Sequence, residues 1–374
     1  MDAWEDYFEI LRCVHCGGHL RAPQSPDQYR GFPRVNREVT CTSCGKGYPL
    51  VENIPVMFID ENRTKLLLDA SAYDSRLLTA RNKVKSLAHL TGDALEQFAE
   101  ECAASPDALS WEMAFWEIWK QSDPALVEGR PEKIRQQLEQ DSTAGGRGKF
   151  FDLVQRSCPD LSGKHLLNIG AGRDLLLELF LSAGCHVIEQ DIVLESLLYL
   201  KRRGASFCIC GDARKLPFQD EVFQLAVCFE VLHHIWPIED PLKELLRTTS
   251  GHVHVVEPNR FALTRLPLCF PGPLKRRLKK LYSGDYSHSP YETPIDPGYF
   301  KDIVRKSHVE IVEFYYTRSS WISSQAKGMR AILRELNILL ALLFPVLSSH
   351  FMGIIQRPSN SPLRAASTHS GQRF

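Results

Sequence analysis

Residues His165-Leu-Leu-Asn-Ile-Gly-Ala-Gly-Arg-Asp174 decide the fold of this chain. The apolar run that ends at Ile169 has the length of a buried strand, and the turn Gly170-Ala-Gly172 breaks it. Helical spacing of apolar residues begins near Leu175. Glycines at such a turn let the backbone bend sharply and let a ligand approach the N-terminus of the following helix. The stretch therefore predicts a strand, a turn and a helix at a ligand-binding edge.

Four more short apolar runs follow, separated by segments with helical periodicity such as Leu175–Leu181 and Leu194–Lys201. Strict alternation of strand and helix indicates a parallel sheet covered on both faces. Right-handed crossovers make such a sheet doubly wound. We therefore expect an α/β, Rossmann-like core over residues 163–257. The expected strands are 165–169, 185–189, 206–210, 224–229 and 252–256, and His350–Gln356 is expected to close the sheet.

Acidic residues follow two of these runs. Asp191 ends the second strand, nineteen residues after Gly172, and this distance suits a carboxylate that hydrogen-bonds both ribose hydroxyls of a nucleotide. Asp212 follows the third strand, in Cys210-Gly-Asp-Ala213. A nicotinamide enzyme would use the same turn and acid, but Leu175 stands where its motif has a third glycine. The pattern favours a ligand with a single adenosine.

The order of these motifs, from Asn168 to His234, resembles the class I S-adenosylmethionine-dependent methyltransferases, particularly their small-molecule and quinone-type members. The resemblance implies that Asp191 binds the ribose, that Asp212 accepts from the adenine amino group and that Ala213 gives the ring a backbone contact. The glycines would frame the methionine part of the cofactor. The implied cofactor-binding set is Asn168, Gly170, Ala171, Gly172, Asp191, Ile192, Asp212, Ala213, Phe229 and Glu230.

Asn168 departs from the family pattern, which usually has an acid at this position. An asparagine side chain accepts a hydrogen bond but carries no charge to complement the ammonium group of the cofactor. One hypothesis is therefore that the cofactor binds weakly. It predicts that Asn168→Asp improves the affinity.

Two histidines, His233 and His234, follow the fourth strand. They lie at the carboxyl edge, where doubly wound sheets bind ligands. In-line positioning supplies most of the acceleration of methyl transfer, but a hydroxyl acceptor also needs a base, and histidine titrates near neutral pH. At most one of the pair is expected to face the site. A helix-start or capping role is the alternative for each of them.

Two CxxC motifs stand near the N-terminus, Cys13-Val-His-Cys16 and Cys41-Thr-Ser-Cys44. Four thiolates on two tight turns make a tetrahedral sulfur site for zinc, and a glycine follows each pair to permit the turn. Such a site has no open coordination position, so it is expected to be structural. His15 is expected to be exposed, because four cysteines already complete the ligand set.

The run Gly47-Tyr-Pro-Leu-Val-Glu-Asn-Ile-Pro-Val-Met-Phe58 resembles a strand of the small zinc-ribbon proteins that activate tRNA and translation-factor methyltransferases. Asn53 stands where that pattern usually has glycine. Asparagine tolerates the left-handed conformation better than most residues, so we expect a turn or a left-handed backbone there.

Composition divides the chain into further regions. We expect a zinc ribbon over residues 9–60, a helical linker or cap over 61–147, the methyltransferase domain over 148–356 and a disordered tail over 357–374. Within the domain, residues 260–290 form a basic insertion.

Two segments bear on the acceptor. Residues 274–281 mix basic residues with leucines, which suits contact with an anionic lipid or a phosphate-bearing substrate, or a solvated lid helix. Residues Ala331–Leu347 are nearly continuously apolar but too short for a confident membrane span, so we expect a buried helix beside the last strand. Together the two segments direct attention to a small-molecule or lipid-linked acceptor.

The overall charge is zero, with 45 basic and 45 acidic residues, so no global field would draw the protein to nucleic acid or to a membrane. The first residues lack the features of a secretory signal. We expect a cytoplasmic protein, with residues 274–281 as its candidate contact with a membrane surface.

Three other interpretations stay open. The chain could be an RNA- or protein-directed methyltransferase that recognises its substrate with the ribbon, or a methyltransferase-like scaffold without activity. The stretch Gly172-Arg-Asp174, together with Cys208 and Cys210, resembles the arsenic methyltransferases, which use thiols to hold the metalloid. Alternating cysteines on a buried strand are, however, more simply core residues.

Overall fold

The computed structural model describes residues 5–24, 34–61, 64, 68, 147–172, 176–235, 237–261, 294–307, 309–317, 328–348 and 350–356. Nearly all of the expected cap over 61–147 and of the basic insertion over 260–290 lies outside the described residues. The tail over 357–374, with its expected disorder, also lies outside them, as does the candidate membrane contact at 274–281.

Five parallel strands form the centre of the sheet, in the order β7-β6-β5-β8-β9. Their order along the chain and their parallel pairing agree with the doubly wound α/β core expected from the sequence, and their ends lie within a few residues of the expected ones. The strands are β5 (His165–Ile169), β6 (His186–Asp191), β7 (Phe207–Gly211), β8 (Phe223–Phe229) and β9 (Thr249–Pro258).

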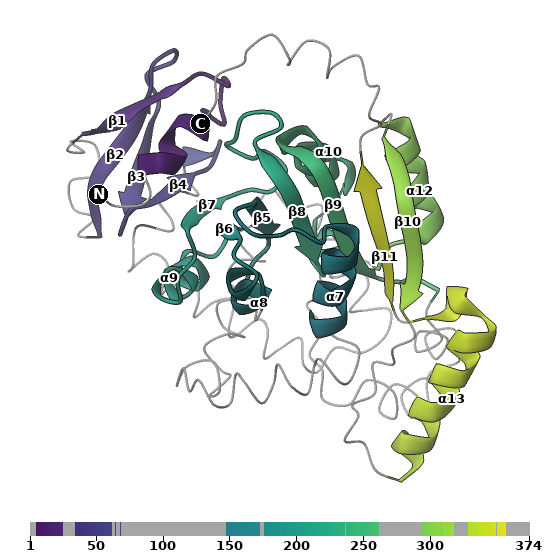
Figure 1. Ribbon diagram of the computed structural model, residues 1–374. Coiled ribbons are helices and arrows are strands. Elements are labelled where there is room, and N and C mark those ends of the chain that lie inside the picture. The colour runs from purple at the N-terminus through teal and green to yellow at the C-terminus, as the bar shows by residue number, and fades with distance from the viewer. Residues whose placement is uncertain are drawn as a thin grey trace, which may run out of the picture.

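Helices cover both faces of this sheet (Figure 1). On one face lie α7 (Arg147–Ser157), α8 (Leu176–Ser182) and α9 (Leu194–Arg202), and on the other lie α10 (Glu239–Thr248) and α12 (Pro297–Lys306). Successive side chains of a strand point to opposite faces, so each face has its own core. Leu166 packs with Phe180 of α8 in one core, and Leu167 packs with Leu245 of α10 in the other.

Antiparallel strands extend the sheet beyond β9. Strand β11 (His350–Gln356) has the bounds expected from the sequence and pairs with β9 on one side and with β10 (Glu310–Thr317) on the other. Because β11 runs opposite to β9, His350 lies across from Pro258, at the carboxyl edge of the parallel strands. The start of β11 therefore lies at the carboxyl edge of the central strands.

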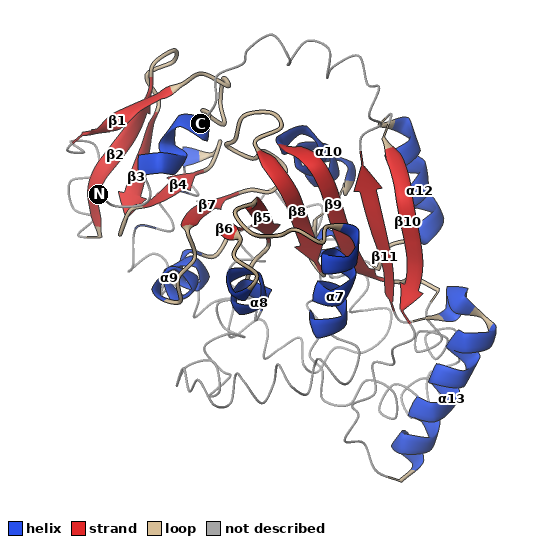
Figure 2. Ribbon diagram, viewed as in Figure 1, coloured by secondary structure: helices blue, strands red, loops and turns tan. Residues whose placement is uncertain are grey.

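The N-terminal region consists of the 3-10 helix Glu5–Ile10 followed by a small antiparallel sheet. Glu52 and Asn53 make its last turn with φ of 49° and 62°, which confirms the left-handed conformation expected at Asn53. Strand β4 pairs in parallel with β7, so the ribbon continues the central sheet into a sheet of eleven strands (Figure 2). Its strands are β1 (Leu20–Gln24), β2 (Val35–Cys41), β3 (Gly47–Val51) and β4 (Ile54–Met57).

Helix α13 (Met329–Leu343) projects beyond the sheet instead of packing beside β11 (Figure 1). Ile332 and Leu343 are each 63% exposed, so the expectation of a buried helix is wrong. The apolar stretch lies outside both cores because the sheet already ends in the β10–β11 pair and α12 covers that end. Among the helices that the structure describes, none is long and apolar enough to cross a membrane.

Candidate active site

The turn after β5 adopts a conformation that suits glycine. Gly170 and Gly172 both have φ of 59°. A Cβ atom at Gly170 would lie 2.4 Å from Cγ2 of Val231, which follows β8, so a larger residue has no room there. The N–H of Ala171 donates to the carbonyl of Gln190 at 3.1 Å, which ties the turn to β6. The turn is therefore held close to both neighbouring strands.

Asp191 is the acid expected to bind the ribose, and the structure places it beside the glycine turn. Its Oδ2 accepts the N–H of Gly172 at 2.6 Å, and its Oδ1 accepts the N–H of Val193 at 2.8 Å. The carboxylate thus spans the end of β6 and the turn after β5. Ile192, from the same implied set, is half-buried in the connection to α9.

Asp212 and Ala213 follow β7 at the same edge of the sheet. Asp212 is paired with Arg214, whose Nη2 donates to Oδ2 at 2.6 Å. This hydrogen bond raises the pKa of Arg214. Sequence reasoning missed Arg214 as a partner of the acid, although a basic residue two positions after an acid in a loop is a usable signal. An adenine amino group would share the carboxylate with this guanidinium.

Phe229 ends β8, and Glu230 follows it. The Phe229 ring lies 5.2 Å from that of Phe150 in α7. Glu230 has φ of 58°, a left-handed conformation that costs free energy for any residue other than glycine and that clusters at functional sites. Its Oε1 lies 2.7 Å from Nε2 of His350 at the start of β11. Apart from Asn168, which lies within β5, the residues of the implied cofactor set therefore lie at the carboxyl edge of four neighbouring strands.

Residues 167–255 match the sequence model of a family described as a methyltransferase domain. This chain contains a methyltransferase domain. The matched region runs from the middle of β5 into β9, so it includes the glycine turn, Asp191 and Asp212. Together with the fold, the match identifies the chain as an S-adenosylmethionine-dependent methyltransferase, as its sequence resemblance implies.

Solved structures with a similar fold include three methyltransferases, each with a TM-score of 0.39. An S-adenosylmethionine-dependent methyltransferase from Archaeoglobus fulgidus is 18% identical, over 58% of this chain and 97% of its own. One from Mesorhizobium loti is 14% identical, over 55% and 96%. Magnesium protoporphyrin IX methyltransferase from Synechocystis, with bound S-adenosylhomocysteine, is 12% identical, over 57% and 83%. No curated protein matches the chain.

The residues of the methyltransferase fit its cofactor. The glycine turn offers backbone without a Cβ atom, and Asp191 and Asp212 are carboxylates at the same edge that could accept from hydroxyl and amino groups of an adenosine. Cys208 and Cys210 do not belong to this edge set, because both are buried along β7. Burial raises the pKa of both thiols, as expected of core residues.

Glu257, at the end of β9, is a residue of the methyltransferase that sequence reasoning missed. It is fully buried, and its Oε1 accepts the N–H groups of Val231 and Leu232 at 3.0 and 2.6 Å. Its Oε2 lies 2.7 Å from Nδ1 of His233. Burial raises the pKa of Glu257 to about 7. An acid followed by proline at the end of an apolar strand was the available signal.

The two candidate bases have different surroundings. His233 is 7% exposed and held by Glu257, whereas His234 is half-buried. Their ring centroids lie 4.0 Å apart. Both residues lie within the short 3-10 helix Leu232–His234, and the next α-helix begins only at Glu239. Of the two, His233 has the fixed ring orientation that a base needs.

Asn168 also has a partner that sequence reasoning missed. Its Nδ2 donates to Oε2 of Glu189 in β6 at 2.8 Å, and both side chains are buried. Glu189 is an acid within the otherwise apolar start of its strand, His186-Val-Ile-Glu189. The spacing that identifies cofactor-binding acids applies to the end of a strand, and Glu189 lies two residues before the end of β6.

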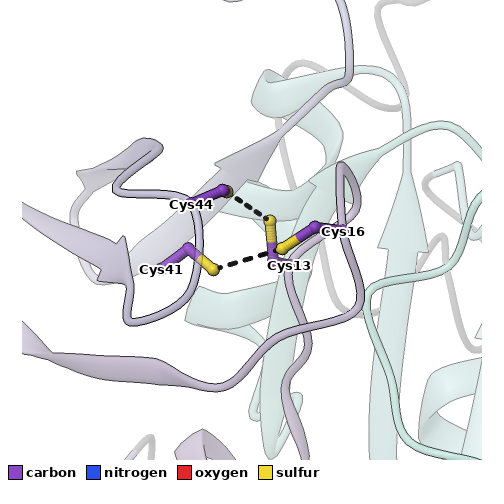
Figure 3. Close-up of side chains that lie close together, drawn as sticks. All are labelled: Cys13, Cys16, Cys41 and Cys44. Atoms are coloured by element: carbon purple, nitrogen blue, oxygen red, sulfur yellow. Dashed lines mark hydrogen bonds between the residues drawn. The ribbon is translucent and has the colours of Figure 1, made fainter.

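The four cysteines of the ribbon meet at one point (Figure 3). One sulfur from each residue lies within 4.8 Å of the other three. Sγ of Cys13 lies 3.7 Å from that of Cys44, and Sγ of Cys16 lies 3.5 Å from that of Cys41. His15 is exposed, as expected.

The pKa values of the cluster differ: the surroundings of Cys41 favour its thiolate, whereas hydrogen bonds from neighbouring thiols raise the pKa of Cys16 and of Cys44. Burial acts to raise the pKa of Cys41, but the backbone N–H groups of Cys44 and Ser43 outweigh it and lower the pKa to about 6. The hydroxyl of Tyr48 lies 3.0 Å from Sγ of Cys13. Thiolates are the form of cysteine that binds metal, so the cluster fits a tetrahedral zinc ion.

Proposed function

We propose that this methyltransferase transfers the methyl group of S-adenosylmethionine, in line, to a small-molecule or lipid-linked acceptor. The observation that carries the proposal is the glycine turn of the matched domain, with Asp191 bound to the N–H of Gly172. The sulfonium of the cofactor already activates its methyl group. The protein therefore contributes chiefly by holding the acceptor in line and by excluding water.

For a hydroxyl acceptor, we assign the base to His233. An ionised Glu257 accepts the hydrogen of Nδ1 at 2.7 Å, which fixes the ring and makes Nε2 the nitrogen that takes a proton. General bases of this kind contribute about a hundredfold to ten-thousandfold. His234, whose ring centroid lies 4.0 Å from that of His233, is the second candidate.

The exposed apolar surface of α13 supports a hydrophobic acceptor. Leu336, Leu339 and Leu343 are spaced along one side of the helix and are between 44% and 63% exposed. Phe344 and Val346, which follow the helix, are exposed as well. A row of large apolar side chains in contact with water is unusual on a soluble surface and marks an interaction site. An amphipathic helix with such a row suits the interface of a membrane.

Hydrogen bonds hold the segment that follows α13 against the carboxyl edge of the sheet. Nδ2 of Asn259, just after β9, donates to the carbonyls of Val346 and Ser348 at 2.7 and 2.9 Å. The segment 345–348 leads from α13 into β11, where His350 contacts Glu230. An acceptor that lies along α13 would therefore have its end near the carboxyl edge of the sheet.

We also propose that the ribbon holds a structural zinc ion on Cys13, Cys16, Cys41 and Cys44. Four thiolates fill a tetrahedral coordination sphere and leave no position for a substrate. The ion would therefore supply folding energy and take no part in methyl transfer.

The test is to incubate the purified protein with a total lipid and metabolite extract and methyl-labelled S-adenosylmethionine. The proposal expects label in an organic-soluble or small-molecule product. Label only in RNA or in protein would instead favour a macromolecular substrate recognised by the ribbon. Calorimetry without any heat from S-adenosylmethionine would favour a scaffold without activity.

A further inference from the structure

Asn168 and Glu189 form a buried polar pair beneath the glycine turn. They are direct neighbours on the parallel strands β5 and β6, and Nδ2 of Asn168 donates to Oε2 of Glu189 at 2.8 Å. Asn168 is 3% exposed and Glu189 is not exposed at all. Burying a carboxylate costs several kcal/mol unless charge or hydrogen bonds compensate for it. The hydrogen bond from Asn168 is one such compensation, and a positive charge bound nearby would be another.

The pair lies close to the carboxyl edge of strands β5 and β6. Asn168 precedes Gly170 by two residues, and Glu189 precedes Asp191 by two. Side chains two positions apart on a strand point to the same face, so Glu189 shares a face with the acid that binds the N–H of Gly172. Two residues of a strand span about 7 Å. Glu189 thus stands one repeat behind Asp191.

We propose that Glu189 supplies the negative charge that complements the ammonium group of S-adenosylmethionine, and that Asn168 is the positioning residue that holds its carboxylate. The family pattern has an acid on the first strand, at Asn168. In this chain the amide at that place donates to an acid on the second strand, so the negative charge lies on the neighbouring strand. This proposal rests on the proposed function, because it takes S-adenosylmethionine as the ligand.

The pair changes the expected effect of Asn168→Asp. The sequence alone suggested that an acid at this position would improve cofactor affinity. In the structure, the new carboxylate would lie within hydrogen-bonding distance of Glu189, and two ionised carboxylates cannot share a buried site. We therefore expect Asn168→Asp to weaken binding, and Asn168→Asp with Glu189→Gln to restore it, since the pair then has one acid and one amide again.

The experiment is a four-protein cycle of wild type, Glu189→Gln, Asn168→Asp and the double variant. Calorimetry measures the affinity for S-adenosylhomocysteine, which has the ammonium group, and for 5′-methylthioadenosine, which lacks the amino-acid part. Glu189→Gln is isosteric and keeps an oxygen that accepts from Asn168. We expect it to weaken S-adenosylhomocysteine at least about tenfold, which is about 1.4 kcal/mol, and to change 5′-methylthioadenosine by less than about threefold.

The double variant provides the second arm. It is expected to bind S-adenosylhomocysteine within about threefold of wild type, and a thermal unfolding curve of each protein shows whether it is folded. If Glu189→Gln does not fold, the double variant alone still tests the exchange of charge between strands. Equal losses for both ligands in Glu189→Gln, or no loss for either, overturn the assignment. If the wild type binds neither ligand, the proposed function itself fails.

Discussion

Glu257 contacts Nδ1 of His233. This contact can be tested by replacing one carboxylate oxygen with an amide nitrogen. In Glu257→Gln, an oxygen can still accept from Val231 and Leu232, but the amide nitrogen turns a donor toward Nδ1 of His233. The ring then takes the tautomer with hydrogen on Nε2, which cannot accept a proton. With a hydroxyl acceptor, we expect kcat to fall about a hundredfold or more while calorimetry shows an unchanged cofactor affinity.

His233→Ala is expected to match the rate of Glu257→Gln, and His234→Ala is expected to stay near wild type. If both His233→Ala and His234→Ala have rates within a few-fold of wild type, neither histidine is the general base.

The raised pKa of Glu257 also predicts a pH dependence of stability. The pKa rises from an ordinary 4.5 to about 7 in the folded protein, so the folded state holds the proton more tightly than the unfolded state does. The contribution is fully present below about pH 4.5 and is lost as the pH rises toward about 7. Urea unfolding should therefore show wild type losing free energy of unfolding relative to Glu257→Gln over this window. A constant difference between the two proteins would contradict the raised pKa of this buried acid.

Gly170 is predicted to tolerate no side chain. Gly170→Ala places a Cβ atom 2.4 Å from Val231, which adds an overpacking cost of about 1–3 kcal/mol to a left-handed strain of about 1–2 kcal/mol. Gly163→Ala is the matched control, because Gly163 has φ of 71° but no heavy atom within 4 Å of such a Cβ. Chemical denaturation should show the larger loss at Gly170, and Val231→Ala should recover part of it. Equal losses at the two glycines would contradict the close approach.

At the level of elements, the ribbon contacts both ends of the segment that carries Asp212. The N–H of Arg12 donates to the carbonyl of Pro217 at 2.8 Å, and the N–H of Gln219 donates to the carbonyl of Ile10 at 2.9 Å. At the other end, Met57 pairs with Gly211. Metal binding in the ribbon should therefore order residues 212–219 as well.

Removal of the metal tests this contact. Chelation, or the variant Cys16→Ser, is expected to lower the melting temperature and to speed amide hydrogen exchange across 212–219, because zinc binding energy is folding energy. His15→Ala changes an exposed neighbour of the same turn and is expected to leave both unchanged. If amide hydrogen exchange across 212–219 is the same with and without metal, the metal in the ribbon does not order this segment.

The surface of α13 gives a prediction of a different kind. Leu339→Gln with Leu343→Gln removes two exposed apolar side chains, so we expect stability to change by no more than about 0.5 kcal/mol per site. Co-sedimentation with vesicles of phosphatidylcholine and phosphatidylglycerol should fall markedly, and Glu335→Gln on the same helix should not reduce it. Wild type that does not sediment with the vesicles would contradict a role of α13 at a lipid surface.

Periodicity made some elements predictable and left others hidden. Strand β5 has the bounds expected from its apolar run, and Asn53 has the expected backbone conformation. Helix α13 was placed wrongly, because a nearly continuous apolar run reads the same whether its surface is buried or exposed. Glu189 and Glu257 were missed, because one acid within an apolar strand has no spacing that marks a site.

At the scale of the whole molecule, sequence reasoning separated two units that the structure joins. The cysteines identified the ribbon and the glycine turn identified the methyltransferase core, since each is a local motif. The pairing of β4 with β7 joins residues more than 150 positions apart, and no local pattern records such a partner. One sheet therefore links the ribbon that carries the thiolate cluster, the carboxyl edge of the parallel strands and the strand β11 that begins at His350.

The most direct test of the account is a calorimetric titration of the purified wild type and of Gly170→Ala with S-adenosylmethionine. We expect saturable binding at one site per chain in the wild type, and a large loss of affinity when a side chain blocks the turn after β5. Absence of binding in the wild type, or equal affinity in the two proteins, would contradict a cofactor site at this turn.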